Sequence, residues 1–201
     1  MAAHALGPVF LSASVPSPDC NPVYRRGIRR VAIREAISAL TLVVVPQGRL
    51  VFGGHPAISP MVHLAAERLG AADRVFIHQS EFFRSVIPPT SLQFRHLVWT
   101  PAEADREESL ARMRERMITS EPFHAGVFIG GMEGVEDEFA LFQRHHPQAL
   151  LLAVASTGSA ARILFDREPG ASKDSGLVTD VAYASLFRRL LTGSASPAAI
   201  P

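Results

Sequence analysis

A glycine turn between an apolar run and a helix-like run is the segment of this chain best suited to chemistry. The mostly apolar residues 124–129 precede Gly130 and Gly131, and residues 135–144 have the composition of a helix. A strand, a glycine turn and a helix start in this order present backbone N–H groups to an anion. Glycine also allows positive φ and lets a phosphate come close to the main chain. Glu138, one turn into the helix, would place a carboxylate beside that anion.

Three further polar or glycine-containing segments follow apolar runs, at residues 12–14, 53–56 and 156–159. If the runs are parallel strands, all four turns open at the same edge of the sheet, where α/β proteins bind ligands. We expect the backbone amides of the two glycine pairs to hold a phosphate there. The candidate ligand-binding residues are Ser12, Ser14, Gly53, Gly54, His55, Gly130, Gly131, Gly134, Thr157 and Gly158.

These candidates also have plainer interpretations. Ser12 and Ser14 are common turn formers, and His55 would be an ordinary hydrogen-bonded loop histidine. Thr157 and its neighbours would cap the next helix. The acids within residues 133–138 would oppose the dipole of a helix start without touching a ligand. The expected convergence of four turns at one edge favours a ligand site over these interpretations.

The order of elements predicts an α/β fold. Short runs rich in Val, Ile, Leu and Phe alternate with patterns of helical period, which is typical of a parallel sheet buried on both faces. We therefore expect a three-layer α/β sandwich, with a mostly parallel sheet and helices on both faces. The expected strands cover residues 9–13, 42–45, 50–52, 74–78, 94–99, 127–129 and 150–155. The expected helices cover residues 27–40, 60–69, 105–118, 135–145, 159–165 and 177–191.

Composition indicates one globular domain. The chain has 201 residues, of which 47% are hydrophobic and 19% charged, so we expect residues 1–192 to form the domain and residues 193–201 a flexible tail. A net charge of +1 argues against nucleic acid as a partner. The single Cys20 fits a reducing compartment, residues 1–8 show no secretory signal, and no apolar run reaches the roughly 20 residues of a membrane span. We expect a cytoplasmic protein with no membrane partner.

No motif for a metal or a cofactor stands out. None of the eight histidines has metal-ligand spacing, and the adjacent His145 and His146 would diverge on a helix. A Gly-x-Ser-x-Gly nucleophile elbow is missing as well. We therefore expect neither a metal ion nor an organic cofactor. The apolar residues 82–83 and 87–89 are expected to fill the core, with a lid or an oligomer contact as the alternative.

Taken together, these motifs resemble the SLOG superfamily, Rossmann-like domains that include the cytokinin-activating LOG enzymes and nucleotide-sensing domains of bacterial conflict systems. The LOG signature is Met-His-x-Arg-Lys, then a strand, then Pro-Gly-Gly-x-Gly-Thr-x-x-Glu. Residues 113–117 and 130–138 occupy these places here. The match implies that Arg116 and Glu138 are the catalytic arginine and glutamate of the motif.

The resemblance is closer still to standalone bacterial SLOG domains of defence systems. It is carried there by residues 10–16 followed by residues 53–60, and it covers roughly residues 9–165. A homo-oligomer is common among such domains and is expected here.

The chain departs from the LOG signature at several positions. Ile129 replaces the proline, Val135 replaces the threonine and Arg114 replaces the histidine. One extra residue also separates Gly131 from Gly134. Because the threonine and the tight turn belong to the family's phosphate grip, these changes count against catalysis more than against nucleotide binding.

The resemblance implies two functions, of which we favour the first. The first is binding or sensing of a nucleotide-derived small molecule, for example an NAD-derived signal, in a bacterial defence setting. The alternative is a LOG-like nucleoside 5′-monophosphate phosphoribohydrolase, which releases base and ribose phosphate. In that enzyme Glu138 would activate water or stabilise the cationic sugar, and Arg116 would hold the substrate. A third interpretation is a purely structural interaction module whose glycine turns hold nothing.

Overall fold

The computed structural model describes residues 6–193, and a six-stranded sheet forms its centre. All neighbouring strands pair in parallel, in the order β4-β3-β2-β1-β5-β6. This arrangement confirms the predicted α/β class. The strands are β1 Val9–Ser14, β2 Leu50–Gly53, β3 Val75–Ser80, β4 His96–Thr100, β5 Ala125–Gly130 and β6 Leu150–Val154.

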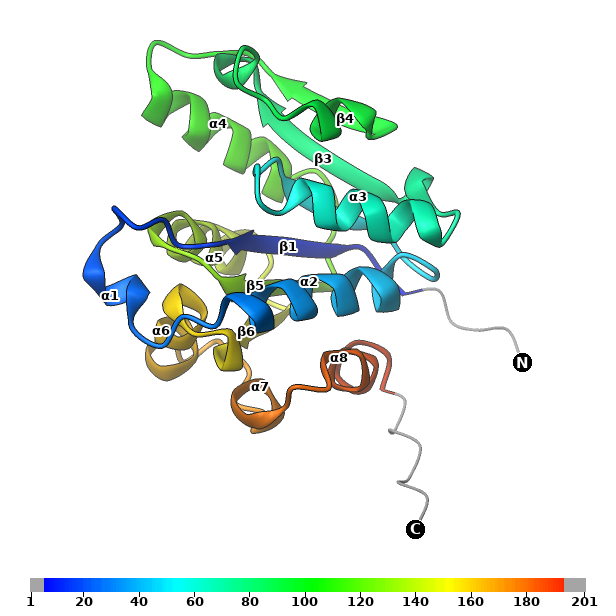
Figure 1. Cartoon of the computed structure of the whole chain (residues 1–201), viewed down its shortest axis with the longest axis vertical. Helices are drawn as coiled ribbons and strands as arrows, with labels where there is room; N and C mark the ends of the chain where they lie inside the picture. Colours follow the sequence, from blue (N-terminus) through cyan, green and yellow to red (C-terminus); the bar gives the residue numbers. More distant parts are fainter. Residues whose placement is uncertain (1–5, 194–201) are drawn as a thin grey trace.

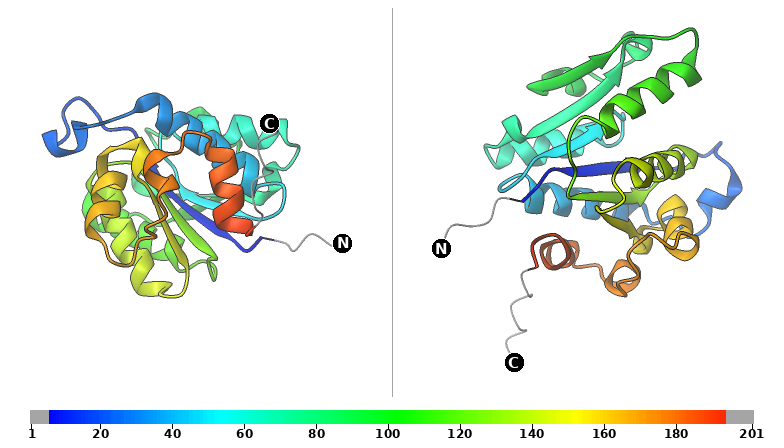
Figure 2. Two further views of the ribbon diagram at one scale, coloured as in Figure 1. Left: turned by 90° about the horizontal axis from the view of Figure 1, so that it is seen from below. Right: turned by 180° about the vertical axis from the view of Figure 1, so that it is seen from behind.

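Helices cover both faces of the sheet, as predicted. The helices are α1 Pro22–Arg25, α2 Arg30–Val44, α3 Ser59–Arg68, α4 Arg106–Ile118, α5 Glu133–His145, α6 Ser159–Arg167, α7 Gly176–Thr179 and α8 Tyr183–Thr192. One apolar core joins α2, α3 and α8 to the sheet, and a second joins α5, α6 and the end of α4 to the opposite face. In Figure 1, α2 and α3 lie in front of the sheet, whereas α4 and α5 lie behind it. The view from behind in Figure 2 brings α4 and α5 to the front.

Short 3₁₀ helices complete the connections. They are η1 Ala72–Arg74, η2 Glu81–Phe83, η3 Pro89–Gln93 and η4 Ala155–Thr157. Two of them, η2 and η3, lie in the connection from β3 to β4, where the sequence predicted core filling. Phe82 is 42% exposed, and none of residues 82–83 and 87–89 is fully buried, so this segment does not fill the core.

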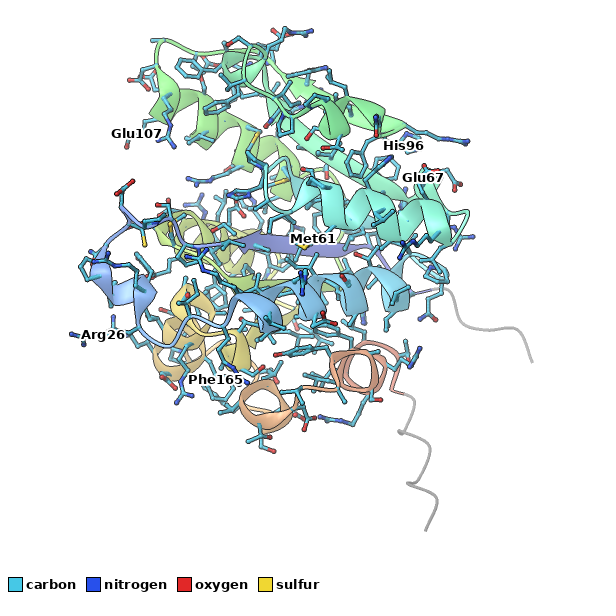
Figure 3. The ribbon with its side chains drawn as sticks, in the orientation of Figure 1. Arg26, Met61, Glu67, His96, Glu107 and Phe165 are labelled. Atoms are coloured by element: carbon cyan, nitrogen blue, oxygen red, sulfur yellow. The ribbon has the colours of Figure 1, made fainter. Side chains whose placement is uncertain are left out.

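The chain changes its direction across the sheet at β1. Strands β2 to β4 are added on one side of β1, and β5 then pairs with the other side, from Val9 opposite Ala125 to Ser14 opposite Gly130. The connections that leave β1 and β5 lead to helices on opposite faces, α2 and α5, which opens a crevice at the carboxyl ends of these strands. Figure 3 shows the side chains of Arg26 and Glu107 at this end of the molecule. The labelled Glu67 and His96 lie at the opposite end.

The strand predicted at residues 42–45 is wrong. Most of that run forms the last turn of α2, which ends at Val44. Its buried residues Ile37, Leu40, Val43 and Val44 continue one helical stripe along the face that packs on the sheet. The β-branched valines favour a strand locally, but burial of this stripe favours the helix.

The last predicted helix, residues 177–191, is divided in two. It consists of α7 and α8, and Asp180 after α7 has extended backbone geometry. Among residues 6–193, none of the helices combines the length and the apolar composition needed to cross a bilayer. The single-domain boundaries stay a prediction, and residues 194–201 of the expected tail lie outside the described residues.

Candidate functional site

A cavity of about 260 Å³ lies at the carboxyl edge of the sheet, beside the crevice at β1. The ends of β1 and β2 form its floor, and the facing sides of α4 and α5 form its walls. It is lined by Ala13, Ser14, Gly53, Gly54, His55, Arg106, Leu110, Met113, Arg114, Met132, Gly134, Val135 and Glu138. Six predicted site residues are therefore brought together here, namely Ser14, Gly53, Gly54, His55, Gly134 and Glu138.

The glycine turn after β5 has the geometry that only glycine tolerates well. Gly130 has φ +59° and Gly131 has φ +91°. A Cβ atom at Gly131 would lie 2.4 Å from a methyl carbon of Val135, and one at Gly130 would lie 2.6 Å from Cδ1 of Ile33. The turn is therefore fixed against both α2 and the first turn of α5.

The amides of this turn are already used within the protein. The N–H of Gly130 donates to Oγ1 of Thr157 at 2.9 Å, and the N–H of Gly131 donates to the carbonyl of Ser14, also at 2.9 Å. The amide of Gly54 likewise donates to the carbonyl of His78. These three amides are therefore not free to hold a phosphate, contrary to the expectation from the sequence. They keep the shape of the turns instead.

Free donors occur one step further along, at the start of α5. An α-helix gives its first amides no internal partner, and the side chain of Met132, the residue before the helix, caps none of them. The amides of Glu133 and Gly134 therefore have no partner within the helix, and Met132 and Gly134 both line the cavity. The positive end of the helix dipole adds to this attraction for an anion.

Arg114 from α4 lies against that helix start. Its Nη1 is 3.1 Å from a carboxylate oxygen of Asp137, and its Nε is 3.3 Å from Oε1 of Glu138. Gly134 makes room for it, since a Cβ atom there would lie only 2.5 Å from Nη2 of Arg114. One more carbon at Gly134 would displace the guanidinium. The glycine that matches the LOG signature therefore admits an arginine beside the amides.

Glu138 is held from two sides within the cavity. The hydroxyl of Ser12 donates to its Oε2 at 2.6 Å, while Arg114 contacts its Oε1. Only 15% of the Glu138 side chain is exposed. Burial raises the pKa of the Glu138 carboxyl above its ordinary value, and the positive charge of Arg114 and the Ser12 hydrogen bond oppose that shift.

Arg116 does not reach this cavity. Its Nη1 donates to the carbonyl of Trp99, and its side chain lines a separate cavity with His78, Val98 and Thr119. Residues two apart on a helix point about 200° away from each other, so Arg114 and Arg116 occupy different faces of α4. Matching the signature letter by letter selected Arg116, but the helix places Arg114 beside Glu138.

Three other predicted residues support the site without lining it. Ser12 is 1% exposed and lies beneath Glu138. Thr157 is fully buried, where its hydroxyl accepts from Gly130 and donates to the carbonyl of Val154. Gly158 allows a close approach, because a Cβ atom there would be 2.1 Å from the carbonyl oxygen of Gly27. The fourth predicted turn therefore stabilises the glycine turn through the hydrogen bond between Thr157 and Gly130.

His55 lies at the rim, where it orders its own loop. Its Nδ1 accepts from the amide of Ala57, and its amide donates to the hydroxyl of Ser59. Burial lowers the pKa of the His55 imidazole, so the ring is neutral at neutral pH and adds no charge to the site. Ser59, the first residue of α3, therefore holds the loop by this hydrogen bond.

Sequence reasoning missed the contribution of α4. Arg106, Leu110, Met113 and Arg114 line the cavity at spacings of four, three and one residues, which form a single stripe on a helix. The signal was present: the helix predicted at residues 105–118 follows a predicted strand, so its first turn had to lie at the carboxyl edge. Among residues 6–193, no three His, Cys, Asp or Glu side chains come together as a metal site.

The parallel sheet, its strand order and a cavity at the carboxyl edge define a Rossmann-like α/β protein. Residues 23–191 match the SLOG cluster3 family, and the chain belongs to that family. The resemblance to the SLOG superfamily seen in the sequence is thereby confirmed. Membership fits a nucleotide-related binding role in broad terms. No match was found among curated proteins.

Proposed function

We propose that this cavity binds a nucleotide-derived small molecule, with a phosphate at the first turn of α5. The observation that carries the proposal is the pair of helix-start amides, at Glu133 and Gly134, next to the guanidinium of Arg114. Amides at a helix start and arginine side chains are typical ligands of phosphate. Arg106, at the first position of α4, lines the same cavity and adds a second positive charge.

The acids around Arg114 compensate its positive charge while the site is empty. Arg114 is paired with Asp137 and Glu138 and is 20% exposed, so its charge is compensated before any ligand arrives. A phosphate would share this guanidinium with the two carboxylates. Binding then depends on the amides and on Arg106 as much as on Arg114, which favours modest, reversible affinity suited to sensing a signal.

The proposed cellular role rests on the resemblance to SLOG domains of bacterial defence systems. We propose that the protein is a cytoplasmic homo-oligomer that senses its ligand in a bacterial defence system. The ligand is then a signal molecule made by another protein, such as an NAD-derived nucleotide.

Thermal unfolding with a matched pair of ligands and a matched pair of variants tests the binding proposal. A nucleoside 5′-monophosphate should raise the melting temperature, and the bare nucleoside should raise it much less. Arg106→Ala should weaken binding of the monophosphate by roughly 5- to 30-fold, which corresponds to about 1–2 kcal/mol for a contact to a charged group.

Arg26→Ala is the control for that variant. Arg26 is an exposed arginine at the same end of the molecule but is not among the residues that line the cavity (Figure 3). Its removal lowers the net charge equally and should leave binding unchanged. Equal losses of monophosphate affinity in the two variants would mean that the net charge of the protein, and not a contact from Arg106, causes the effect. The absence of any shift with mono-, di-, cyclic and dinucleotides would reject the proposal.

Hydrolysis of a nucleoside 5′-monophosphate is the second candidate, and the environment of Glu138 favours it. A partly buried carboxyl with a raised pKa, held by Ser12 and Arg114, is suited to general acid–base chemistry at the sugar. Glu138 would then activate water or stabilise the cationic sugar, and Arg114 would take the role that the signature gave to Arg116.

Product analysis separates the two candidates. If the site is catalytic, the wild type releases free base from a nucleoside monophosphate, and Glu138→Gln abolishes release while it retains binding. If the domain is a sensor, the wild type shows no turnover and Glu138→Gln changes affinity alone. We favour the sensor, because the proline and threonine of the LOG signature are absent. Steady base release by the wild type would reverse that choice.

A further inference from the structure

A second cavity of about 280 Å³ adjoins the proposed phosphate site. The two cavities share Gly54, His55, Arg106, Leu110 and Met113, so they form one continuous depression with two compartments. The first compartment, described above, contains Arg114, Glu138 and the start of α5. The second extends from it toward the segment between β3 and β4.

The second compartment has a different chemical character. It is lined mainly by the apolar side chains of Phe83, Val86, Ile87, Pro88, Leu110 and Met113. Among the described residues that line it, Arg106, on the boundary with the first compartment, is the only Arg, Lys, Asp or Glu. A site with one charged and one apolar compartment fits a ligand that joins an anionic group to an uncharged one.

The segment from Glu81 to Gln93, which contains η2 and η3, forms the outer wall of this compartment. Val86 lines the compartment and yet is 70% exposed, and the neighbouring ring of Phe83 packs edge to face on Phe82. An apolar side chain that stays exposed over a cavity contributes little hydrophobic stabilisation to the free protein. It would be covered by a flat ligand group in the compartment.

Gln79 adds an amide group to the second compartment, beside Arg106 and His55. It lies at the end of β3, is 5% exposed and packs against Gly54, where a Cβ atom would approach its Nε2 to 3.0 Å. Within the described part of the chain, its carboxamide has no hydrogen-bond partner. A carboxamide offers a donor and an acceptor side by side, which matches the edge of a heterocyclic base.

We propose that the second compartment binds the base of the ligand, while the start of α5 binds its phosphate. This inference rests on the proposed function and narrows it to base-bearing nucleoside phosphates, as opposed to sugar phosphates. Segment 81–93 contacts the ring faces, and Gln79 pairs with the ring edge. Both therefore determine which base is accepted.

Titration calorimetry with adenosine 5′-monophosphate and ribose 5-phosphate tests this inference, since the sugar carbon C1 bears the base in the first and a hydroxyl in the second. The wild type should bind the nucleotide at least tenfold more tightly than the sugar phosphate. Val86→Asn should weaken nucleotide binding by about five- to tenfold, as expected for losing much of one buried aliphatic contact, and should leave ribose 5-phosphate unchanged. An uncharged substitution is used so that the phosphate experiences no new field.

Leu92→Asn is the matched control. Leu92 lies on the same segment, is 58% exposed and is not among the residues that line either compartment, so both ligands should bind this variant as they bind the wild type. Equal wild-type affinity for nucleotide and sugar phosphate overturns the inference but leaves the phosphate site standing. The inference is also overturned, with the phosphate site left standing, if Val86→Asn loses no more nucleotide affinity than Leu92→Asn. Failure of both ligands to bind the wild type overturns this inference, and together with no melting shift across the mono-, di-, cyclic and dinucleotides it rejects the proposed function as well.

Discussion

Adding one methyl group at Gly134 is expected to weaken ligand binding without weakening the fold. A Cβ atom at this position would lie 2.5 Å from Nη2 and 3.7 Å from Cζ of Arg114. Apart from the backbone of its own helix and its chain neighbours, these are the only atoms of residues 6–193 within 4 Å. The atom that must move is therefore the end of a flexible side chain. Gly134 lies within α5, so Ala fits the backbone and improves helix propensity by up to about 1 kcal/mol.

The magnitude follows from what the guanidinium does. If Arg114 contacts the phosphate, displacing it removes a charge-assisted contact of about 1.5–3 kcal/mol, which weakens binding roughly 10- to 150-fold. The melting temperature of the free protein should stay the same or rise slightly. Gly134→Ala would then separate binding from stability, which few substitutions in a buried site can do.

Calorimetry on a double-mutant cycle identifies the cause. Gly134→Ala, Arg114→Ala and the double variant are titrated with a nucleoside 5′-monophosphate. Because both single changes act on one guanidinium, the double variant should bind no more weakly than Arg114→Ala alone. Additive losses would mean that the methyl group obstructs the ligand directly. Wild-type affinity in Gly134→Ala would refute the role assigned to Arg114.

Three further predictions concern the support of the site and the assembly. Thr157→Val should lower the free energy of unfolding by about 1–3 kcal/mol in a urea titration, because the buried amide of Gly130 loses its acceptor. The control Thr119→Val alters an exposed hydroxyl and should lower the free energy of unfolding much less. Burial raises the folded-state pKa of Glu138, so its contribution to stability is full below the ordinary glutamate pKa and is lost as the pH rises through the raised value. The unfolding free energy of the wild type relative to Glu138→Gln should therefore fall from acidic to neutral pH, and a constant difference would contradict the assigned environment. Light scattering should give a mass of at least two chains, and the mass of one chain at micromolar concentration would contradict the homo-oligomer.

Much of the fold could be predicted because pattern and packing agree in most elements. Strands β1, β2 and β3 are short apolar runs followed by turn residues, and their parallel pairing follows from burial on both faces. The failure at residues 42–45 has a physical cause. Three valines in a row indicate a strand locally, but the stripe that α2 buries against the sheet extends through them.

The candidate site could be predicted in its location and less well in its atoms. The sequence indicated which turns share an edge. Two of the four, residues 12–14 and 53–56, line the cavity, and the glycine turn is followed directly by the lining residues Met132 and Gly134. It could not show that the amides of Gly130 and Gly131 already have acceptors, because these acceptors, on Thr157 and Ser14, come from distant parts of the chain. Nor could the signature distinguish Arg114 from Arg116, since the choice depends on which face of α4 packs toward α5.

A crystal structure of the protein with a bound nucleoside 5′-monophosphate tests the central claim most directly. We predict that phosphate oxygens accept hydrogen bonds of about 2.7–3.2 Å from the amides of Glu133 and Gly134, with a guanidinium of Arg114 or Arg106 alongside. The amides of Gly130 and Gly131 should keep their bonds to Thr157 and Ser14. A phosphate bound to the Gly130 and Gly131 amides instead, or in the separate cavity beside Arg116, would contradict the account.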